Sequence, residues 1–364
     1  MDLLLCGDVM TGRGIDQVLP GPLNPRIYES FLDSALEYVE LAEQRSGRIA
    51  RPVDFAYIWG EALTEIAARA PDVRLVNLET SVTTSEDPAP KGINYRMSPE
   101  NVPCLLVPPI DCCVLANNHV LDWGTAGLLE TVQALARHGI ATAGAGKDLE
   151  EATGPARLET PSGRRVLVFA FGSTDSGIPL GWAATATRPG VSLLSDLSER
   201  SAGRIESQIR RHRRPGDFVI VSIHWGSNWG YAVPAPHRRF AHRLIDTGMV
   251  DTVHGHSSHH PRGIEVYRDR PILYGCGDFI SDYEGISGHE SYRPELVLAY
   301  FLGLSDETKQ LERLEMAVFR SRRLRLERAG EEEAGWVGRV LNAEGAKMGT
   351  SVDLTEKGIL SLRW

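Results

Sequence analysis

The chain has 364 residues, of which 42% are hydrophobic and 24% are charged, an ordinary balance for a globular protein with a sizeable core. Its formal charge of -9 and its pI near 5.7 argue against a nucleic-acid partner, because no basic tract is long enough to displace many phosphate counterions. No stretch approaches the ~18 consecutive apolar residues that cross a bilayer, and the first residues lack the pattern of a signal peptide. We therefore expect a cytoplasmic protein that has no membrane partner.

Apolar, strand-like runs alternate with amphipathic, helix-like stretches along most of the chain. The first half reads as strand LLLCGDV, helix 57–70, strand VRLVNLE, strand DCCVLANNH, helix 126–138 and strand IATAGAG. The second half reads as hairpin RLETPSGRRVLVFAFG, helix 197–213, strand FVIVSIHW, helix 237–247, strand VDTVHGH and hairpin GIEVYRDRPILYGCGDF. Runs such as CCVLA and FVIVSI are apolar at consecutive positions, which is typical of strands buried on both faces.

The alternation predicts an α/β fold, with a layered β-sheet core flanked by helices. No Pro/Gly/Ser linker, repeat or low-complexity tract divides the chain. We predict one domain over residues 1–325 and a C-terminal appendage over residues 326–364, packed on the same domain. The five cysteines lie in apolar runs without metal-ligand spacing, so we expect them to be core residues.

Five apolar runs end in residues that can bind a metal or move a proton. These residues are Asp8, Glu79, the Asn117-Asn118-His119 triplet, His224, and the pair His254 and His256. Because ligands of open α/β sheets gather beyond the carboxyl ends of the strands, we expect the five ends to form one site. Carboxylates, an amide oxygen and imidazoles, without a thiolate, are a set that binds metal ions through oxygen and nitrogen.

Two His/Asp combinations are candidates for acid/base chemistry. His119 and Asp122 are three residues apart, a spacing that lets the carboxylate orient the imidazole if the segment turns helically. Asp278 follows another apolar run and could orient His256 or His259, although a turn cap is the alternative. Two opposed pairs are what proton exchange at a carbon atom needs, since one group removes the proton and the other returns it.

Arginines and aromatic residues near these motifs are candidates for substrate binding. Arg13 and Arg96 could each clamp a substrate carboxylate, or each could be a structural ion-pair partner. Trp225 and Trp229 directly follow His224 and would suit the wall of a peptide site, although core packing explains Trp225 equally well.

Seven motifs resemble, in order, those of the CapA-like family of poly-γ-glutamate capsule synthesis proteins, which has the calcineurin-like metallophosphoesterase fold. They are GDVMTGR, NLETSVT, NYRMSPENV, ANNHVLDWG, IHWGSNW, GHSSHHPRGIEVY and ILYGCGDF, and they extend from Gly7 to Phe279. The resemblance implies one metal position surrounded by Asn118, Glu79, His224 and His256. It implies a second position surrounded by Asp8, Glu79 and His259, with His119 as the acid/base residue and His254 and His260 packed nearby.

The chain departs from this resemblance at Met10, where a metallophosphoesterase normally has a histidine. A thioether is a poor ligand for hard divalent ions, so one of the two positions is depleted. We therefore expect one divalent ion of the hard type, Ca²⁺, Mg²⁺ or Mn²⁺, and no organic cofactor.

The leading hypothesis is a metal-dependent enzyme that epimerises a Cα position in a peptide, because some soluble members of this kind resemble the lasso-peptide tryptophan epimerase. The bases would be His119 and either His259 or His256. The alternatives are a metal-dependent hydrolase of a phosphoester or γ-glutamyl amide, and a noncatalytic component of poly-γ-glutamate assembly.

Overall fold

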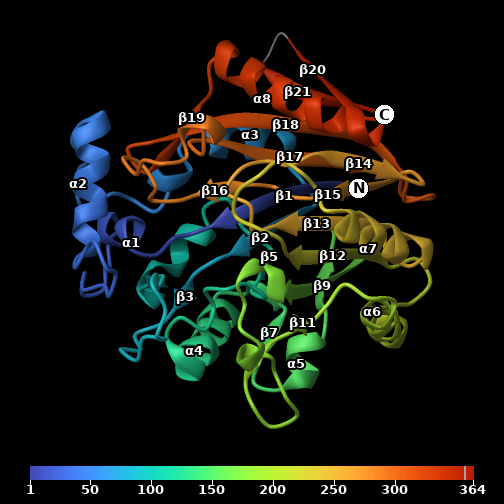
Figure 1. The fold of residues 1–364 in the computed structure, drawn as a ribbon, viewed down its shortest axis with the longest axis horizontal. Helices are drawn as coiled ribbons and strands as arrows, with labels where there is room; N and C mark the ends of the chain where they lie inside the picture. The colour runs from blue at the N-terminus through green and yellow to red at the C-terminus, as the bar shows by residue number, and fades with distance from the viewer. Residues whose placement is uncertain (356–357) are drawn as a thin grey trace.

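The computed structural model describes residues 1–355 and 358–364 (Figure 1). Among these residues, a ten-stranded sheet has the order β20-β21-β18-β17-β1-β2-β5-β6, with β16 paired to β1 and β19 to β18. Its strands are β1 (Asp2–Val9), β2 (Val73–Leu78), β5 (Cys112–Val114), β6 (Ala141–Ala143), β16 (Asp278–Ile280), β17 (Leu296–Leu304), β18 (Leu311–Arg322), β19 (Arg325–Arg328), β20 (Ser351–Leu354) and β21 (Ile359–Arg363).

A second sheet of seven strands has the order β11-β9-β12-β13-β15-β14, with β8 paired to β9. Its strands are β8 (Ala156–Glu159), β9 (Arg165–Ser173), β11 (Leu193–Leu194), β12 (Phe218–His224), β13 (Thr252–His256), β14 (Ile264–Tyr267) and β15 (Arg270–Leu273). Two small sheets pair β3 (Ser81–Val82) with β4 (Arg96–Met97) and β7 (Ala145–Gly146) with β10 (Gly190–Val191).

The two large sheets pack face to face, with helices on their outer sides. On β1, Leu3 and Leu5 belong to the core shared with the second sheet, whereas Leu4 and Cys6 join the core beneath the helices. This alternation follows from the two-residue period of a strand, and it explains why the runs are apolar at consecutive positions. The predicted α/β class, with layered sheets flanked by helices, is confirmed.

Helices lie on both outer faces of the paired sheets. Side chains of α2, α3 and α4 join the core outside the ten-stranded sheet, and those of α6 and α7 the core outside the second sheet. The helices are α1 (Gly14–Val18), α2 (Ala35–Ser46), α3 (Ala62–Arg69), α4 (Gly124–Arg137), α5 (Leu149–Thr153), α6 (Glu199–His212), α7 (Ala235–Asp246) and α8 (Glu331–Gly345).

Two predicted elements are interrupted at glycines. The helix expected over residues 57–70 is a 3-10 turn (Tyr57–Trp59) followed by α3, because Gly60 has a φ of 47°. A Cβ atom at Gly60 would lie 2.1 Å from the carbonyl oxygen of Leu326, so contact with β19 decides the break. Gly144, with a φ of 95°, separates β6 from β7, which belong to different sheets.

The C-terminal residues continue the ten-stranded sheet. The expected boundary between residues 325 and 326 falls within β19, and β21 pairs with β18. Side chains of α8 join the core between the sheets. The division into a domain and an appendage stays a prediction. In residues 1–355 and 358–364, no helix is both long and apolar enough to cross a membrane.

Candidate metal centre

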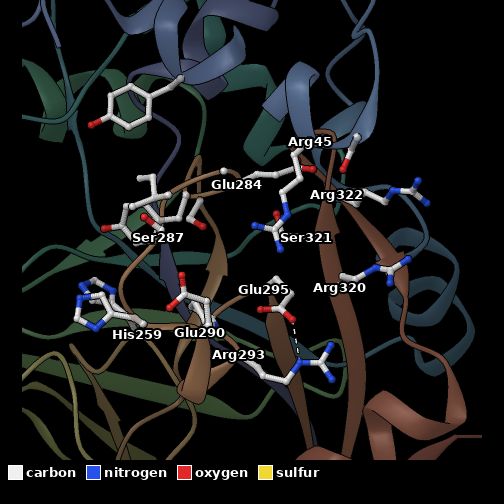
Figure 2. Close-up of a pocket in the computed structure, with 18 of the residues that line it drawn as sticks. Arg45, His259, Glu284, Ser287, Glu290, Arg293, Glu295, Arg320, Ser321 and Arg322 are labelled. Carbon is white, nitrogen blue, oxygen red and sulfur yellow. Dashed lines mark hydrogen bonds and ion pairs between the residues drawn. The ribbon is translucent and has the colours of Figure 1, made fainter. Parts of the chain in front are cut away.

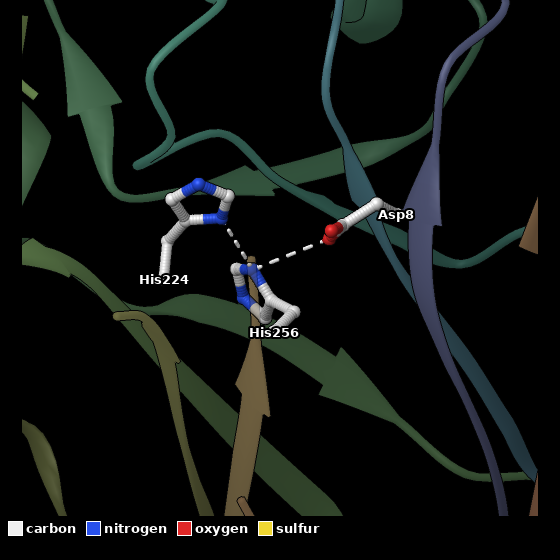
Figure 3. A group of neighbouring side chains, drawn as sticks. All are labelled: Asp8, His224 and His256. Atoms are coloured by element: carbon white, nitrogen blue, oxygen red, sulfur yellow. Dashed lines mark hydrogen bonds and ion pairs between the residues drawn. The ribbon is translucent and has the colours of Figure 1, made fainter. Parts of the chain in front are cut away.

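The first candidate group for a metal ion consists of Asp8, His224 and His256, at the carboxyl ends of β1, β12 and β13 (Figure 3). His224 lies opposite His256 in the parallel β12–β13 pair, and their Nδ1 atoms are 2.9 Å apart. His256 Nδ1 lies 3.6 Å from Asp8 Oδ1. One ligand atom of each residue lies within 4.8 Å of the others, and all three residues are buried.

Hydrogen bonds behind this group fix which nitrogen of His256 carries its proton. His254 Nε2 lies 2.9 Å from the Cys6 carbonyl oxygen, which can only accept, so Nε2 is protonated. Burial lowers the pKa of His254 to about 4, so the ring is neutral at pH 7 and its Nδ1 accepts from the Ser222 hydroxyl. Ser222 Oγ therefore accepts from His256 Nε2, which leaves a lone pair on His256 Nδ1. That lone pair faces the first group, as a metal ligand requires.

The second candidate group shares Asp8 and adds His259 and Asp278. Asp278 begins β16 and lies opposite Asp8 in the parallel β1–β16 pair. His259 Nδ1 lies 2.8 Å from Asp278 Oδ1, so the structure pairs Asp278 with His259, one of its two expected partners.

Buried carboxylates and neutral imidazoles make the first group suited to a cation. Burial and the nearby Asp278 carboxylate raise the pKa of Asp8 to about 7. Burial, followed by Asp8 and Asp278, raises the pKa of Glu79 well above its usual value. Burial lowers the pKa values of His224 and His256, which keeps both imidazoles neutral. Neutral imidazole lone pairs beside crowded carboxylates fit a divalent ion, since a cation offsets the repulsion between the acids.

Glu79 and Asn118 lie beside the first group, but the shared residue differs from the expectation. The resemblance implied that Glu79 takes part in both metal positions, whereas Asp8 belongs to both groups in the structure. Glu79 follows β2, and its Oε1 lies 3.9 Å from His224 Nε2 and 3.8 Å from His119 Nε2. Asn118 Oδ1 lies 2.9 Å from His224 Nε2.

The His119–Asp122 pair forms as expected, three residues apart in the turn after β5. His119 Nδ1 lies 2.6 Å from Asp122 Oδ2. Asp122 also accepts from the Lys91 ammonium at 2.7 Å and from the Tyr95 backbone N–H at 2.7 Å. Burial, opposed by Asp122 and reinforced by Lys91, lowers the pKa of His119 to about 4. His119 is therefore a neutral imidazole at pH 7, with its Nδ1–H held by a carboxylate.

Comparison with known proteins places the chain in a family. The model described as "Bacterial capsule synthesis protein PGA_cap" matches residues 2–283. The chain belongs to the PGA_cap family. It is 48% identical over 352 residues to the "Probable polyglutamine synthesis accessory protein" of Mycobacterium tuberculosis, covering 96% of this chain and 92% of that protein. It is 29% identical over 279 residues to the "PGA biosynthesis protein CapA" of Bacillus subtilis, covering 76% of this chain and 62% of that protein. The expected CapA-like membership is thus confirmed.

The two arginines expected to bind substrate have partners within this PGA_cap protein. Arg13 is buried, and its guanidinium donates to both carboxylate oxygens of Asp282, at 3.1 and 2.5 Å, and to Glu29 at 2.9 Å. Arg96 donates to the Ser85 carbonyl oxygen and lies 3.9 Å above the Trp123 ring. Both placements favour the structural alternative that the sequence left open.

The two tryptophans expected at the site occupy different environments. Trp225 is buried in the core beneath α6 and α7, where it stacks on His237 at 4.7 Å. Trp229 stacks on His289 at 3.8 Å and lines a cavity of about 770 Å³ together with His259. Only Trp229 has the placement of a substrate wall.

The cavity connects the second group with a charged surface. Figure 2 shows His259 on one side of it, with Arg320 and Arg322 on the other. Arg293 is paired with Glu295 at 2.8 Å, and the charge of Arg45 contributes to lowering the pKa of Glu290. The cavity therefore presents both charged and aromatic contacts to a ligand that reaches His259.

Several site residues were missed from the sequence. Ser222 and Asn77 could have been found, because each lies two residues before a predicted site residue and so shares its strand face. Asn77 donates to Asp8 Oδ1 at 2.8 Å. Lys91 gave no such signal, since it lies in an irregular loop far from Asp122 in sequence.

Proposed function

We propose that this PGA_cap protein is an accessory factor in the synthesis of a glutamate- or glutamine-containing polymer, and that its metal-dependent site cleaves amide bonds of that polymer. The observation that carries the proposal is the near full-length similarity to the mycobacterial polyglutamine synthesis accessory protein. The CapA names of more distant relatives point the same way. We further propose that the two facing sheets represent the metallophosphoesterase fold, which the helices on both outer faces support.

Asp8, His224 and His256 would hold the ion, with Glu79 and Asn118 beside them. A bound divalent ion would supply Lewis-acid polarisation of the amide carbonyl oxygen. The mixed carboxylate and imidazole set favours Mn²⁺ over Ca²⁺ and Mg²⁺, because Mn²⁺ is the one transition-metal ion of the three.

His119 is the residue placed to move the proton. Asp122 holds its Nδ1–H, so the lone pair of Nε2 can accept a proton from the attacking water. The same nitrogen can then give this proton to the leaving amide nitrogen as the C–N bond breaks and the new C–O bond forms. The low pKa of His119, about 4, keeps the ring in the basic form at pH 7.

The test is incubation of the purified protein and MnCl₂ with poly-γ-glutamate and with polyglutamine peptides. New amino termini, measured with an amine-reactive dye, should appear with one of the polymers. His119→Asn should lower the rate at least about 100-fold. His138→Asn, at the end of α4, is the matched control and should retain the wild-type rate. Binding of polymer without cleavage, equal in wild type and His119→Asn, would instead support a noncatalytic assembly component.

Epimerisation of a peptide, the leading hypothesis from the sequence, gains no support from the names of the relatives reported above. It stays an untested prediction, which the same incubations can address in deuterated water. Incorporation of deuterium at Cα without new amino termini would restore it.

A further inference from the structure

Lys91 reaches the His119–Asp122 pair from a loop that contains no helix or strand. The loop connects β3 with β4 and runs along the turn that carries the pair. The backbone N–H of Ala89 donates to the Asp122 carbonyl oxygen at 2.7 Å, and the side-chain amide of Asn94 donates to the same oxygen at 3.1 Å. The loop is therefore fixed to the turn before and after Lys91.

The Lys91 ammonium contacts two parts of the site at once. Its Nζ donates to Asp122 Oδ1 at 2.7 Å and to the backbone carbonyl oxygen of Asn118 at 2.5 Å. Asp122 supports His119, whose Nδ1 lies 2.6 Å from Asp122 Oδ2. Asn118 lies beside the first metal group, because its Oδ1 is 2.9 Å from His224 Nε2. One side chain thus joins the support of the proton-moving residue to a neighbour of the metal group.

The burial of Asp122 makes its contact with Lys91 hard to replace. The Asp122 side chain is fully buried, whereas that of Lys91 is 27% exposed. Oδ1 of Asp122 accepts from Lys91, while Oδ2 accepts from His119 and from the Tyr95 N–H. A buried carboxylate oxygen without a donor is unfavourable. Without the ammonium, we therefore expect the carboxylate to turn or to admit water.

The orientation of Asp122 decides which nitrogen of His119 can accept a proton. A carboxylate only accepts hydrogen bonds, so Nδ1 of His119 carries the proton and Nε2 keeps its lone pair. This Nε2 lies 3.8 Å from Glu79 Oε1, which lies 3.9 Å from His224 Nε2. The lone pair is thus directed toward the first metal group. A carboxylate that turns away would allow the other tautomer, whose Nε2–H cannot accept a proton.

The position of Lys91 is itself fixed. Its backbone N–H donates to the Ala89 carbonyl oxygen at 2.8 Å. Its Nζ lies 5.4 Å from the centroid of the Trp182 ring, within the range of a cation–π contact. A compact ammonium can face several acceptors at once, whereas the donors of a guanidinium lie in one plane. A lysine therefore suits acceptors that come from two residues of one turn.

We propose that Lys91 is a positioning residue, which holds Asp122 and the Asn118 backbone around one ammonium and so keeps the Nε2 lone pair of His119 directed toward the metal group. The effect of Lys91 on the reaction rate rests on the proposed amide cleavage. Its effect on the tautomer of His119 does not, and it holds whichever reaction the site performs.

The test compares Lys91→Met with the wild type. NMR of the metal-free protein with ¹⁵N-labelled histidine reports the tautomer of His119, and the amine-dye assay with MnCl₂ reports cleavage. Wild type should show the Nδ1–H tautomer, and Lys91→Met a mixture of both tautomers. The kcat of Lys91→Met should fall at least about tenfold with KM unchanged, because the lysine orients the proton-moving group and does not bind substrate. The Mn²⁺ bound per chain should stay the same.

Lys309→Met is the matched control, because Lys309 is another partly buried lysine in similar contacts. It donates to the Asp217 carbonyl oxygen and lies 3.6 Å from the Asp251 carboxylate. The control should keep the wild-type tautomer and kcat. Ethylammonium, which supplies a free ammonium group, should restore part of the rate in Lys91→Ala but not in His119→Asn.

An unchanged tautomer in Lys91→Met would overturn the proposal, whatever the rate of cleavage. If the wild type cleaves neither polymer, the proposed function fails, while the NMR result still decides the role of Lys91. If Lys91→Met does not fold, NMR of the wild type with ¹⁵N-labelled lysine decides the question. The Lys91 ammonium should exchange slowly with water, because it is hydrogen-bonded. Exchange as fast as that of the exposed Lys147 would overturn the proposal.

Discussion

The His119–Asp122 and His259–Asp278 pairs have the same inner geometry but different surroundings. Their Nδ1 to carboxylate distances are 2.6 and 2.8 Å. Asp122 also accepts hydrogen bonds from Lys91 and from a backbone N–H. Asp278 lies opposite Asp8, and one of its carboxylate oxygens has no hydrogen-bond partner among the described residues. Burial, with help from Lys91, lowers the pKa of His119 to about 4. Burial acts the same way on His259, but Asp278 and Asp8 outweigh it and raise its pKa. The further partners of the carboxylate therefore decide whether the histidine of a His/Asp pair is ready to take a proton or favours its protonated form.

Removing the carboxylate of each His/Asp pair should reveal the largest difference between the two pairs. Asp122→Ala leaves Lys91, the Tyr95 N–H and His119 without their acceptor, so we expect a loss of about 3 kcal/mol in the free energy of unfolding. Asp278→Ala removes one hydrogen bond and also a repulsion with Asp8, so the loss should be about 1 kcal/mol or less. Urea unfolding in EDTA measures both, and equal losses would contradict the distinction.

Metal should stabilise Asp122→Ala as much as the wild type. At about 100 times its dissociation constant, an ion that binds only the folded protein adds about 2.7 kcal/mol. We expect Asp122→Ala to keep the full gain on addition of Mn²⁺, because its Asp8–His224–His256 group is intact. Thermal melts with and without Mn²⁺ make the measurement, and Asp8→Ala should show almost no gain.

The two histidines should respond oppositely to pH in the metal-free protein. The folded pKa of His119 lies below the unfolded value of 6.5, so the unfolded chain binds the extra proton between pH 6.5 and 4. His119 thus costs stability as the pH falls through this range, and His119→Gln should reduce the acid sensitivity by up to about 3 kcal/mol. His259 has a raised pKa, so its contribution is present below pH 6.5 and is lost as the pH rises through its folded value. Urea titrations at several pH values measure the two contributions to stability, and NMR of labelled histidines measures the two pKa values. A pKa shift in the same direction for both histidines would contradict the account.

The smallest expected effect concerns the cavity beside His259. Trp229→Ala removes a ring 5.3 Å from His259 and should weaken binding of a polymer fragment by about 1 kcal/mol. It should leave the metal content unchanged, because Trp229 is in neither metal group. Fluorescence anisotropy of a labelled fragment measures the affinity. Unaltered affinity would remove Trp229 from the substrate wall.

Local patterns explain why the fold class and the strand ends could be predicted. Period-two alternation and apolar runs identify β1, β12 and β13, and parallel strands bring their carboxyl ends together. The interruption of the expected helix at Gly60 could not be predicted from the sequence, because it depends on contact with Leu326. The carboxylate partner of Arg13 and the lysine partner of Asp122 could not be predicted either, since Asp282 and Lys91 lie far away in sequence. The polymer substrate could be proposed only from the names of the relatives, because the site residues alone suit several reactions.

The most direct test of the central claim is anomalous diffraction at the manganese edge from a crystal grown with MnCl₂. The account predicts a peak between Asp8, His224 and His256. A crystal that shows no peak at this group, with the side chains arranged as described above, would contradict the claim that this buried Asp/His group forms a metal centre.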